Sequence, residues 1–383
     1  MKIGIFVTTA GRRGGGPETY EIQLIRALAR LDKTNRYTIY CTTKSGPPAI
    51  GVSQPNFSYR VLWPGNRWIS IPVALPLMLI LDRVDFYHAT VVPPPWSTKP
   101  LILSILCSSN WTHPEFYPKR VVWRLNKLLA KGLNQAQHLC CISQKLIDDV
   151  NDMWRVPRER MSVTYMGVGP EFYPRPKDDA QTSMKERYGI TGRFLLFIGQ
   201  QQERKNVFRT VEAYAKARRE AGAYSLPKLL LVGREDDPND PIGQCIRNAG
   251  VVEHVVRLRY IDHKDLPELY SVADALVFPS LWEGFGIPII EAMACGAPVV
   301  TSTATCLPEV AGDAALIVDP ESVDAIADAI LRVQQDNELR RVLIDKGLRR
   351  AQSFTWENCA RTTLEAYENM RQPVEAEKVL REA

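Results

Sequence analysis

The fold class is decided by one stretch, Phe278-Pro-Ser-Leu-Trp-Glu-Gly-Phe-Gly-Ile-Pro-Ile-Ile-Glu-Ala-Met-Ala-Cys-Gly-Ala-Pro-Val-Val300. The apolar run from Ala275 to Phe278 predicts a buried parallel strand. Pro288 suits the start of a helix, because the missing N–H of a proline costs nothing there. Gly296 then predicts the end of that helix. The stretch therefore predicts strand, loop, helix and strand, which is the repeating unit of an open α/β sheet.

The loop between this strand and helix is the predicted ligand site. Ligands of α/β sheets bind at the carboxyl ends of the strands. Gly284 and Gly286 let backbone N–H groups approach a ligand closely, and the positive end of the following helix suits a phosphate. Glu283 falls on the loop and Glu291 in the first turns of the helix. The two carboxylates are therefore expected to hold two parts of an extended ligand rather than to act as a close acid–base pair.

The run from Glu283 to Glu291 resembles the E-x7-E motif of family 4 glycosyltransferases, which are retaining enzymes of GT-B fold. The resemblance implies that Glu283 binds hydroxyls of the donor sugar and that Glu291 binds the nucleotide ribose. It also assigns donor contacts to the residues between them, Gly284, Phe285, Gly286 and Ile287. A glycine-rich turn followed by a glutamate near a helix start is the purely structural alternative, and the full run favours the family.

Length and composition predict two domains of ordinary globular character. The 383 residues exceed what a single core fills, and 45% of them are hydrophobic and 24% charged. The formal net charge of +5 is modest and fits an anionic nucleotide or an acidic membrane surface. Nucleic acid is disfavoured as a partner, because no basic run interleaved with aromatic residues dominates the chain.

Cysteine usage and apolar windows predict a cytoplasmic protein. The eight cysteines form no C-x-x-C pair, so neither a zinc nor a redox motif is indicated, and a reducing compartment is the simplest setting. The first residues, Met1 to Val7, predict a strand rather than a signal peptide. The most apolar window, Ile69 to Leu81, contains two prolines and is too short to span a bilayer.

The chain opens with a predicted strand, a glycine loop and an amphipathic helix, as a doubly wound domain does. The glycines do not match G-x-G-x-x-G, so a dinucleotide fingerprint is unsupported. Gly15 and Gly16 nevertheless suit close approach to a diphosphate at the helix start, with charge from Arg12 and Arg13. A flexible surface loop is the alternative. Family 4 enzymes carry a glycine-rich loop here that faces the donor phosphate.

The sequence departs from the family in the stretch from Pro100 to Pro118, just after the strand that is expected there. Relatives usually carry His-Asp there, with the histidine near the reacting sugar, whereas this chain has Leu106 and Cys107. Neither side chain can make the hydrogen bonds of an imidazole or a carboxylate. Three interpretations stay open: an altered acceptor pocket, a substitute such as Asn110 or His113, or weak activity. His88, at the end of another predicted strand, is a further candidate contact to acceptor or sugar.

The segment from Lys119 to Gly132 predicts a basic amphipathic helix. An ordinary domain helix with a solvated face is the favoured interpretation. The alternative is contact with anionic lipid at the inner face of the plasma membrane, as in relatives whose acceptor is membrane-anchored.

The second domain begins with a predicted strand at 194–198, followed by a polar loop. Arg204 and Lys205 place two cations where charge grows on a diphosphate leaving group as the glycosidic bond breaks, so they would stabilise that transition state. Family members carry Arg-Lys here, and often another arginine just after the glycine. In this chain Gln200 follows Gly199, so one cation is missing, and Arg12 or Arg13 is expected to compensate. Gly199 itself is a candidate donor contact. The resemblance places the loops after two later strands beside the nucleotide base, with candidate contacts from Arg234, Tyr260 and Ile261.

The resemblance covers nearly the whole chain and implies an α/β protein of GT-B fold, with two Rossmann-like doubly wound domains facing a central cleft. The first domain is predicted at 1–175, with a C-terminal helix at about 356–372 crossing back to it, and the second at 184–355. Two prolines and the polar run 177–183 predict the linker between them.

The implied reaction is retaining transfer of a hexose from a nucleotide sugar to a hydroxyl of a saccharide or a lipid-linked glycan. Glu283, Lys205 and Arg204 are its candidate catalytic residues, and neither a metal nor an enzymic nucleophile is required. Similarity to bacterial mannosyltransferases of polysaccharide and lipopolysaccharide assembly makes GDP-mannose the preferred donor, with a UDP-sugar as the alternative. Two other functions stay open, namely a degenerate nucleotide-sugar-binding protein of GT-B fold and a GT-B sugar-nucleotide epimerase.

Overall fold

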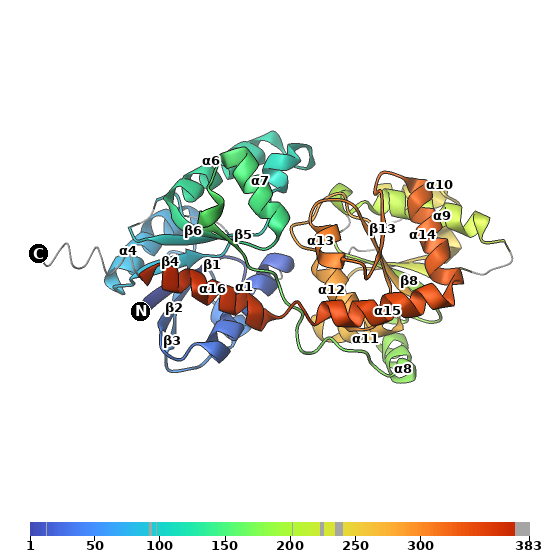
Figure 1. Cartoon of the computed structure of the whole chain (residues 1–383), viewed down its shortest axis with the longest axis horizontal. Helices are drawn as coiled ribbons and strands as arrows, with labels where there is room; N and C mark the ends of the chain where they lie inside the picture. The colour runs from blue at the N-terminus through green and yellow to red at the C-terminus, as the bar shows by residue number, and fades with distance from the viewer. Residues whose placement is uncertain are drawn as a thin grey trace, which may run out of the picture. The chain divides into compact units, whose positions relative to one another are not determined.

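The computed structural model describes residues 1–371 except 13, 92–93, 97, 201, 223–225 and 234–239, and it leaves out the side chain of Arg67. The predicted charge of Arg13 and the predicted base contact Arg234 therefore lie outside the described residues. The chain divides into two compact units (Figure 1). One unit is formed by Met1–Gly167 with Thr355–Ala383, and the other by Val168–Phe354.

The first unit contains a sheet of seven strands that pair in parallel, in the order β3-β2-β1-β4-β5-β6-β7. The central strands β1, β4 and β5 are almost wholly buried, as expected for a parallel sheet covered on both faces. The strand bounds are β1 Lys2–Val7, β2 Arg36–Cys41, β3 Phe57–Val61, β4 Phe86–Ala89, β5 Leu101–Ile105, β6 Ala136–Cys141 and β7 Met161–Val163.

The helices of the first unit include one from the end of the chain. Helix α16 packs against α1, with the rings of Tyr20 and Trp356 6.3 Å apart, so the predicted return of the C-terminal helix to the first unit is confirmed. The remaining bounds are α1 Gly16–Leu31, α2 Gly46–Ile50, α3 Arg67–Ile69, the π-helix η1 Ser70–Ala74, α4 Leu75–Leu81, α5 Ser109–Thr112, the 3-10 turn η2 Pro114–Phe116, α6 Lys119–Gln135, α7 Gln144–Trp154, η3 Arg158–Arg160 and α16 Trp356–Asn369.

The second unit contains a six-stranded parallel sheet in the order β10-β9-β8-β11-β12-β13. In chain order within the unit this is the 3-2-1-4-5-6 arrangement of a doubly wound fold, whose strand order reverses between its first and fourth strands, here β8 and β11. The strand bounds are β8 Phe194–Ile198, β9 Lys228–Val232, β10 Val255–Leu258, β11 Ala275–Phe278, β12 Val299–Ser302 and β13 Leu316–Val318. The strand expected at 275–278 is β11.

Helices flank this second sheet as well. Their bounds are α8 Lys177–Tyr188, η4 Glu203–Lys205, α9 Val207–Glu220, α10 Pro241–Asn248, η5 Val252–His254, η6 His263–Asp265, α11 Leu266–Val272, α12 Ile287–Ala294, α13 Leu307–Ala311, α14 Val323–Gln335 and α15 Asn337–Ala351. Across the described ranges, none of the helices combines the length and the apolar character that crossing a bilayer demands.

The predicted linker needs a correction. The polar run 177–183 begins helix α8, which buries Ala180 and Met184 and packs against α11. Ser183 Oγ also donates a hydrogen bond to Glu268 Oε2 at 2.5 Å. The segment folds because two acidic residues stand in its first turn, where they favour the helix dipole. The chain enters the second unit at Val168, whose N–H donates to the carbonyl oxygen of Phe354 at 3.0 Å.

Candidate active site

The candidate site of the second unit lies at the carboxyl ends of β8 and β11, where the strand order reverses. Lys205 ends the turn η4 after β8, and Glu283 lies on the loop after β11. Lys205 Nζ donates a hydrogen bond to Glu283 Oε1, and both residues are only 8% exposed. Arg204 Nη1 lies 3.6 Å from Glu283 Oε2. The structure therefore places all three predicted catalytic residues together, with one carboxylate between two cations.

Asn206 fixes this arrangement. Its backbone is left-handed, with φ of 62°, and its side-chain amide donates to the carbonyl oxygens of Pro279 at 2.9 Å and Pro320 at 2.6 Å. The N–H of Leu281 returns a bond to the carbonyl oxygen of Arg204 at 2.8 Å. These bonds tie the two loops together, so the positions of both charged partners are set by the backbone. The sequence analysis did not single out Asn206, although an asparagine directly before a helix often marks a helix start or a left-handed backbone.

The charge balance of the site favours an anion. Burial lowers the pKa of Lys205, and the neighbouring Glu283 carboxylate opposes that shift. Lys205 Nζ also lies 4.7 Å above the ring of Phe278, a favourable cation–π contact. Two cations against one carboxylate leave a positive surplus at the strand ends. Such a surplus can neutralise a phosphate group through charge-assisted hydrogen bonds.

The backbone conformation of Gly286, in the loop before α12, is unfavourable for a side chain. Gly286 is left-handed, with φ of 95°, and a Cβ atom there would lie 2.8 Å from Leu307 Cδ2. The ring of Phe285 is buried and packs edge-on against Phe354, with 5.6 Å between centroids. Gly284 is buried as well, and Ile287 is the first residue of α12. The predicted donor-binding loop is therefore held by packing and leads directly into the positive end of α12.

Glu291 occupies a separate environment further along α12. Tyr270 donates a hydrogen bond to its Oε2 at 3.0 Å. Burial raises the pKa of the Glu291 carboxyl to about 8, the hydrogen bond from Tyr270 opposes the shift, and the charge of Glu171 adds to it. Glu291 thus keeps its proton at neutral pH in the free protein. Because Glu283 and Glu291 have different partners, the structure agrees with two carboxylates that serve different parts of a ligand.

The loops after β8 and β9 approach each other so closely that only glycine fits. Gly199 and Gly233 have φ of 136° and 132°, and a Cβ atom on Gly233 would lie 2.1 Å from the carbonyl oxygen of Gly199. Of the predicted base contacts nearby, Tyr260 is 56% exposed and Ile261 is buried. Both follow β10, so they lie after a carboxyl strand end, and their contact with a base stays a prediction.

The glycine loop of the first unit is bound by the protein's own carboxylates. Glu21 accepts the N–H groups of Thr8, Thr9 and Ala10, each at 2.8 Å. Glu18 accepts those of Gly11 at 2.7 Å, Arg12 at 3.2 Å and Gly14 at 2.6 Å. Sequence reasoning missed both glutamates. The exposed Gly15 and Gly16 follow at the start of α1, and their predicted contact with a diphosphate stays a prediction.

His88 is a structural residue rather than the predicted contact to acceptor or sugar. It is fully buried in β4, with Nδ1 2.8 Å from Tyr367 Oη and Nε2 2.7 Å from Ser104 Oγ. Ser104 in turn lies 2.7 Å from Tyr20 Oη. Burial lowers the pKa of the imidazole to about 3, so the ring is neutral. The side chain points into the core because α16 covers it, which no local pattern in the sequence could indicate.

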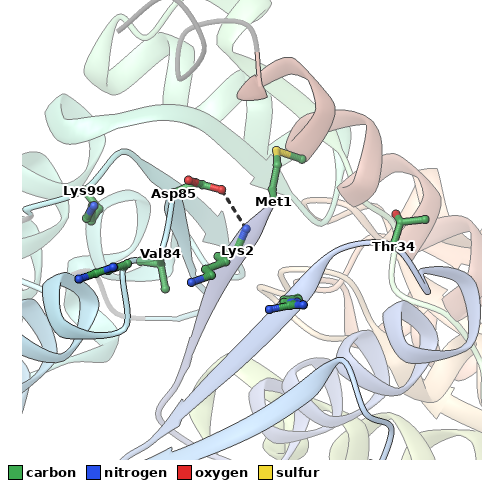
Figure 2. A pocket seen from close by; sticks show the side chains of 8 residues that line it. Met1, Lys2, Thr34, Val84, Asp85 and Lys99 are labelled. Atoms are coloured by element: carbon green, nitrogen blue, oxygen red, sulfur yellow. Dashed lines mark hydrogen bonds between the residues drawn. The ribbon is translucent and has the colours of Figure 1, made fainter. Parts of the chain in front are cut away.

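A cavity of about 590 Å³ opens at the edge of the first sheet where the strands begin, away from their carboxyl ends (Figure 2). It is lined near the amino ends of β1, β2 and β4, where Asp85 accepts the N–H of Lys2 at 2.9 Å. Ligand sites of doubly wound sheets lie at the carboxyl ends, so this cavity is separate from the candidate site. Within the described residues, His, Cys, Asp and Glu side chains form no cluster of three or more suited to a metal ion.

Comparison with known proteins decides the family. A model described as Glycosyltransferase Family 4 matches residues 14–172, and one described as Glycosyl transferases group 1 matches residues 181–350. O-antigen chain mannosyltransferase B of Escherichia coli is 35% identical over 313 residues, which is 81% of this chain and 79% of that protein. The chain belongs to glycosyltransferase family 4.

Solved structures agree with this family 4 assignment at the level of the fold. Sucrose-phosphate synthase from Thermosynechococcus elongatus matches with a TM-score of 0.78 and 20% identity, over 97% of this chain and 100% of that one. Anabaena HepE, solved in complex with UDP-glucose, matches with a TM-score of 0.75 and 18% identity, over 96% and 100%. The predictions of a GT-B fold and of a glycosyltransferase are confirmed.

This family 4 glycosyltransferase differs from the usual pattern at the end of β5. Cys107 is exposed, and its Sγ lies 2.9 Å from Ser109 Oγ. Asn110, a proposed substitute, donates from its side-chain amide to Asn126 Oδ1 of α6 at 2.8 Å. His113 stacks on Phe116, with 5.5 Å between ring centroids. Neither candidate is buried, and substrate contact by either stays a prediction.

Proposed function

We propose that this glycosyltransferase transfers mannose, with retention of configuration, from GDP-mannose to a hydroxyl of a saccharide or lipid-linked glycan. The relative that is 35% identical is named as a mannosyltransferase of O-antigen chains, and a structural neighbour is solved with a sugar linked to a nucleoside diphosphate. The structural observation that carries the proposal is the buried cluster of Lys205, Arg204 and Glu283 at the reversal of strand order.

The cluster suits both ends of a sugar diphosphate. A carboxylate has about four lone-pair directions, so Glu283 can accept sugar hydroxyls while Lys205 stays bound to it. Arg204 is more exposed than Lys205 and lies farther from the Glu283 carboxylate, so its guanidinium can turn toward a phosphate. Glu291, in its own environment, is assigned to the ribose.

The reaction breaks the bond between the anomeric carbon and the diphosphate oxygen and forms a bond from that carbon to the acceptor oxygen. The acceptor attacks from the face that the diphosphate leaves, so the configuration is retained without an enzymic nucleophile. The acceptor proton passes to the leaving diphosphate, so no enzymic base is needed. Negative charge grows on the leaving group in this step. Lys205 and Arg204 stabilise the transition state because they are fixed cations in a water-poor site, where such interactions are strongest.

A donor screen tests the proposal. Thermal unfolding is measured with GDP-, UDP-, ADP- and dTDP-sugars, and we expect GDP-mannose to stabilise most, by about 3 kcal/mol at a hundredfold excess over Kd. Transfer to a mannose-terminated oligosaccharide is then followed, with the anomeric configuration of the product read by NMR. Stabilisation by a UDP-sugar alone would contradict the donor, and inversion would contradict the stereochemistry.

Substitution of Glu283 separates binding from turnover. Glu283→Ala should lose transfer while GDP affinity changes little, because its carboxylate is assigned to the sugar. Glu338→Ala, an exposed site in the same unit, is the matched control and should behave like the wild type. Normal transfer by Glu283→Ala would remove the assigned role.

We propose a cytoplasmic setting for this reaction. All eight cysteines are free thiols, as a reducing compartment maintains them. Fractionation of the producing cell, with activity followed across the fractions, tests this location.

A further inference from the structure

One helical segment of the first unit exposes only apolar side chains. From residue 68 to residue 81 the chain runs through α3, the π-helix η1 and α4, and every exposed side chain in that range is large and apolar. The one polar residue of the range, Ser70, is buried. We call the exposed set the apolar face; its members are Trp68, Ile69, Val73, Leu77, Ile80 and Leu81.

This clustering is unlike the described surface of the second unit. Exposed large apolar residues of the second unit, such as Val252 and Val342, come from separate elements. Single exposed apolar side chains are normal in soluble proteins, whereas a continuous patch marks a surface that something covers. A helix that buries one side and exposes only apolar residues on the other has two apolar faces. Among the described residues of the first unit, nothing covers the second face.

A basic helix borders the apolar face. Helix α6 carries five cations and no acidic residue: Lys119, Arg120, Arg124, Lys127 and Lys131. The guanidinium of Arg124 lies 5.5 Å above the ring of Trp68, which joins the two surfaces. Trp123 is 67% exposed, with Lys127 Nζ 5.1 Å from its ring centroid. Of the acidic residues next to these segments in sequence, Asp82 is paired with Arg60, and Glu115 lies on η2.

This charge pattern selects one occupant. In a twofold dimer formed through the apolar face, each partner would use the same patch of surface. The two copies of the basic helix α6 would then lie near each other, with like charges opposed. An anionic bilayer instead offers hydrocarbon to the apolar face and phosphates to the cations. Exposed tryptophans beside lysines and arginines are also the residues that proteins place at the level of lipid headgroups.

We propose that the apolar face and α6 together form a surface that docks the first unit on an anionic bilayer. The apolar face enters the boundary between headgroups and acyl chains, and the cations of α6 contact lipid phosphates. All the residues that form this surface lie in the first unit, so the proposal does not depend on which sugar the enzyme transfers.

Vesicle flotation of the full-length protein tests the proposal. Two vesicle types are compared: phosphatidylcholine alone, and phosphatidylcholine with about one third phosphatidylglycerol to supply negative charge. We expect binding to the anionic vesicles at physiological salt, at least tenfold weaker binding to the neutral ones, and loss of the difference at high salt, which screens surface charge.

Matched variants separate the two parts of the surface. Val73→Asp should reduce binding to anionic vesicles at least tenfold, whereas Val252→Asp should not, although the two valines are 56% and 53% exposed. Lys127→Gln should weaken binding about fivefold, the value of one cation at an anionic surface. Its control is Lys185→Gln on α8 of the second unit, another exposed lysine, which should leave binding unchanged. Thermal unfolding confirms that each variant is folded.

Three outcomes would overturn the proposal. The first is a wild-type protein that binds neither vesicle type. The second is Val73→Asp binding as tightly as the wild type. The third is a wild-type dimer that Val73→Asp converts to a monomer in light scattering, since the apolar face would then join two copies of the chain rather than meet lipid.

Discussion

Lys205 and Glu283 form a buried ion pair across 78 positions of sequence. The pair stands where the order of strands in the second sheet reverses, between β8 and β11. Its members follow strands that are neighbours in the sheet but distant in the chain, so the site exists only when β8 and β11 have paired.

Removal of Lys205 should cost more stability than removal of Arg204. Lys205→Ala leaves a buried carboxylate without its hydrogen-bonded partner, and we expect a loss of about 3 kcal/mol in the free energy of unfolding. Arg204→Ala removes a longer and more exposed contact and should cost about 1 kcal/mol or less. Urea unfolding measures both. Equal losses in the free energy of unfolding would contradict a stronger interaction of Glu283 with Lys205 than with Arg204.

Transfer should fall in Lys205→Ala by about a hundredfold or more, as when other charge-stabilising donors are removed. A double-mutant cycle of Lys205→Met with Glu283→Gln checks the pairing, because contacting residues give non-additive unfolding energies. If the unfolding energies of the two single variants add up to that of the double variant, Lys205 and Glu283 do not interact.

Glu291 should make stability fall as pH rises. Its pKa is about 8 in the folded protein against an ordinary value of 4.5, so the folded state keeps a proton that the unfolded state has released. Its stabilising contribution is therefore full below about pH 4.5 and is lost as pH rises through about 8. Between these values the free energy of unfolding should decline by about 1.4 kcal/mol per pH unit relative to Glu291→Gln.

Urea unfolding of both proteins between pH 5 and pH 9 tests this slope. Glu291→Gln keeps an acceptor for the hydroxyl of Tyr270 while removing the titrating group. Parallel pH profiles would mean that the Glu291 carboxyl is ionised in the folded protein.

Gly233→Ala should damage the second unit. Its Cβ would overlap the carbonyl oxygen of Gly199, a backbone atom that cannot swing aside, and its φ of 132° is unfavourable for alanine. We expect a loss of several kcal/mol together with weaker donor binding, because the loop after β8 must move. Gly250→Ala is the control: its φ is also positive, but its Cβ would meet nothing within 4 Å. It should cost about 1 kcal/mol. Similar melting temperatures for the two variants would contradict the predicted overlap.

His88→Ala should destabilise the protein without altering GDP affinity. The substitution removes the imidazole partner of Tyr367 and one of the two partners of Ser104, which keeps Tyr20, at a cost of about 2 to 4 kcal/mol. The folded pKa of His88, about 3, is lower than its ordinary 6.5, so its stabilising contribution is present above pH 6.5 and is lost as pH falls toward 3.

Calorimetric titration with GDP checks the affinity, and His113→Ala, a partly exposed histidine, is the stability control. A large loss of GDP affinity in His88→Ala alone would contradict the purely structural role of His88.

Local signals predicted the elements around the site well. The strand at 275–278 and the following glycine loop and helix were predictable because apolar run, proline and glycine each act on their immediate neighbours. Lys205 and Glu283 were assigned to one ligand site because each follows a predicted strand, and ligands bind at the carboxyl ends of parallel strands. Their direct hydrogen bond was not predicted.

Features that depend on distant partners could not be predicted. His88 is enclosed by α16, which lies 279 positions away at Tyr367. Segment 177–183 has the composition of a linker, and only α11 gives it a surface to pack against. Glu18 and Glu21 bind the first glycine loop because the backbone N–H groups of that loop point toward their carboxylates. No local pattern in the sequence predicts this loop conformation.

The position of α16 has a consequence for synthesis. The sheet of the first unit is encoded by residue 163, but the helix that covers α1 begins only at Trp356. At about 10 residues per second on the ribosome, roughly 20 s separate the two. During that interval the flank of α1 that later receives Trp356 is bare, while the second unit, continuous from Val168 to Phe354, can complete itself. The half of the protein that emerges first is therefore the half that finishes folding last.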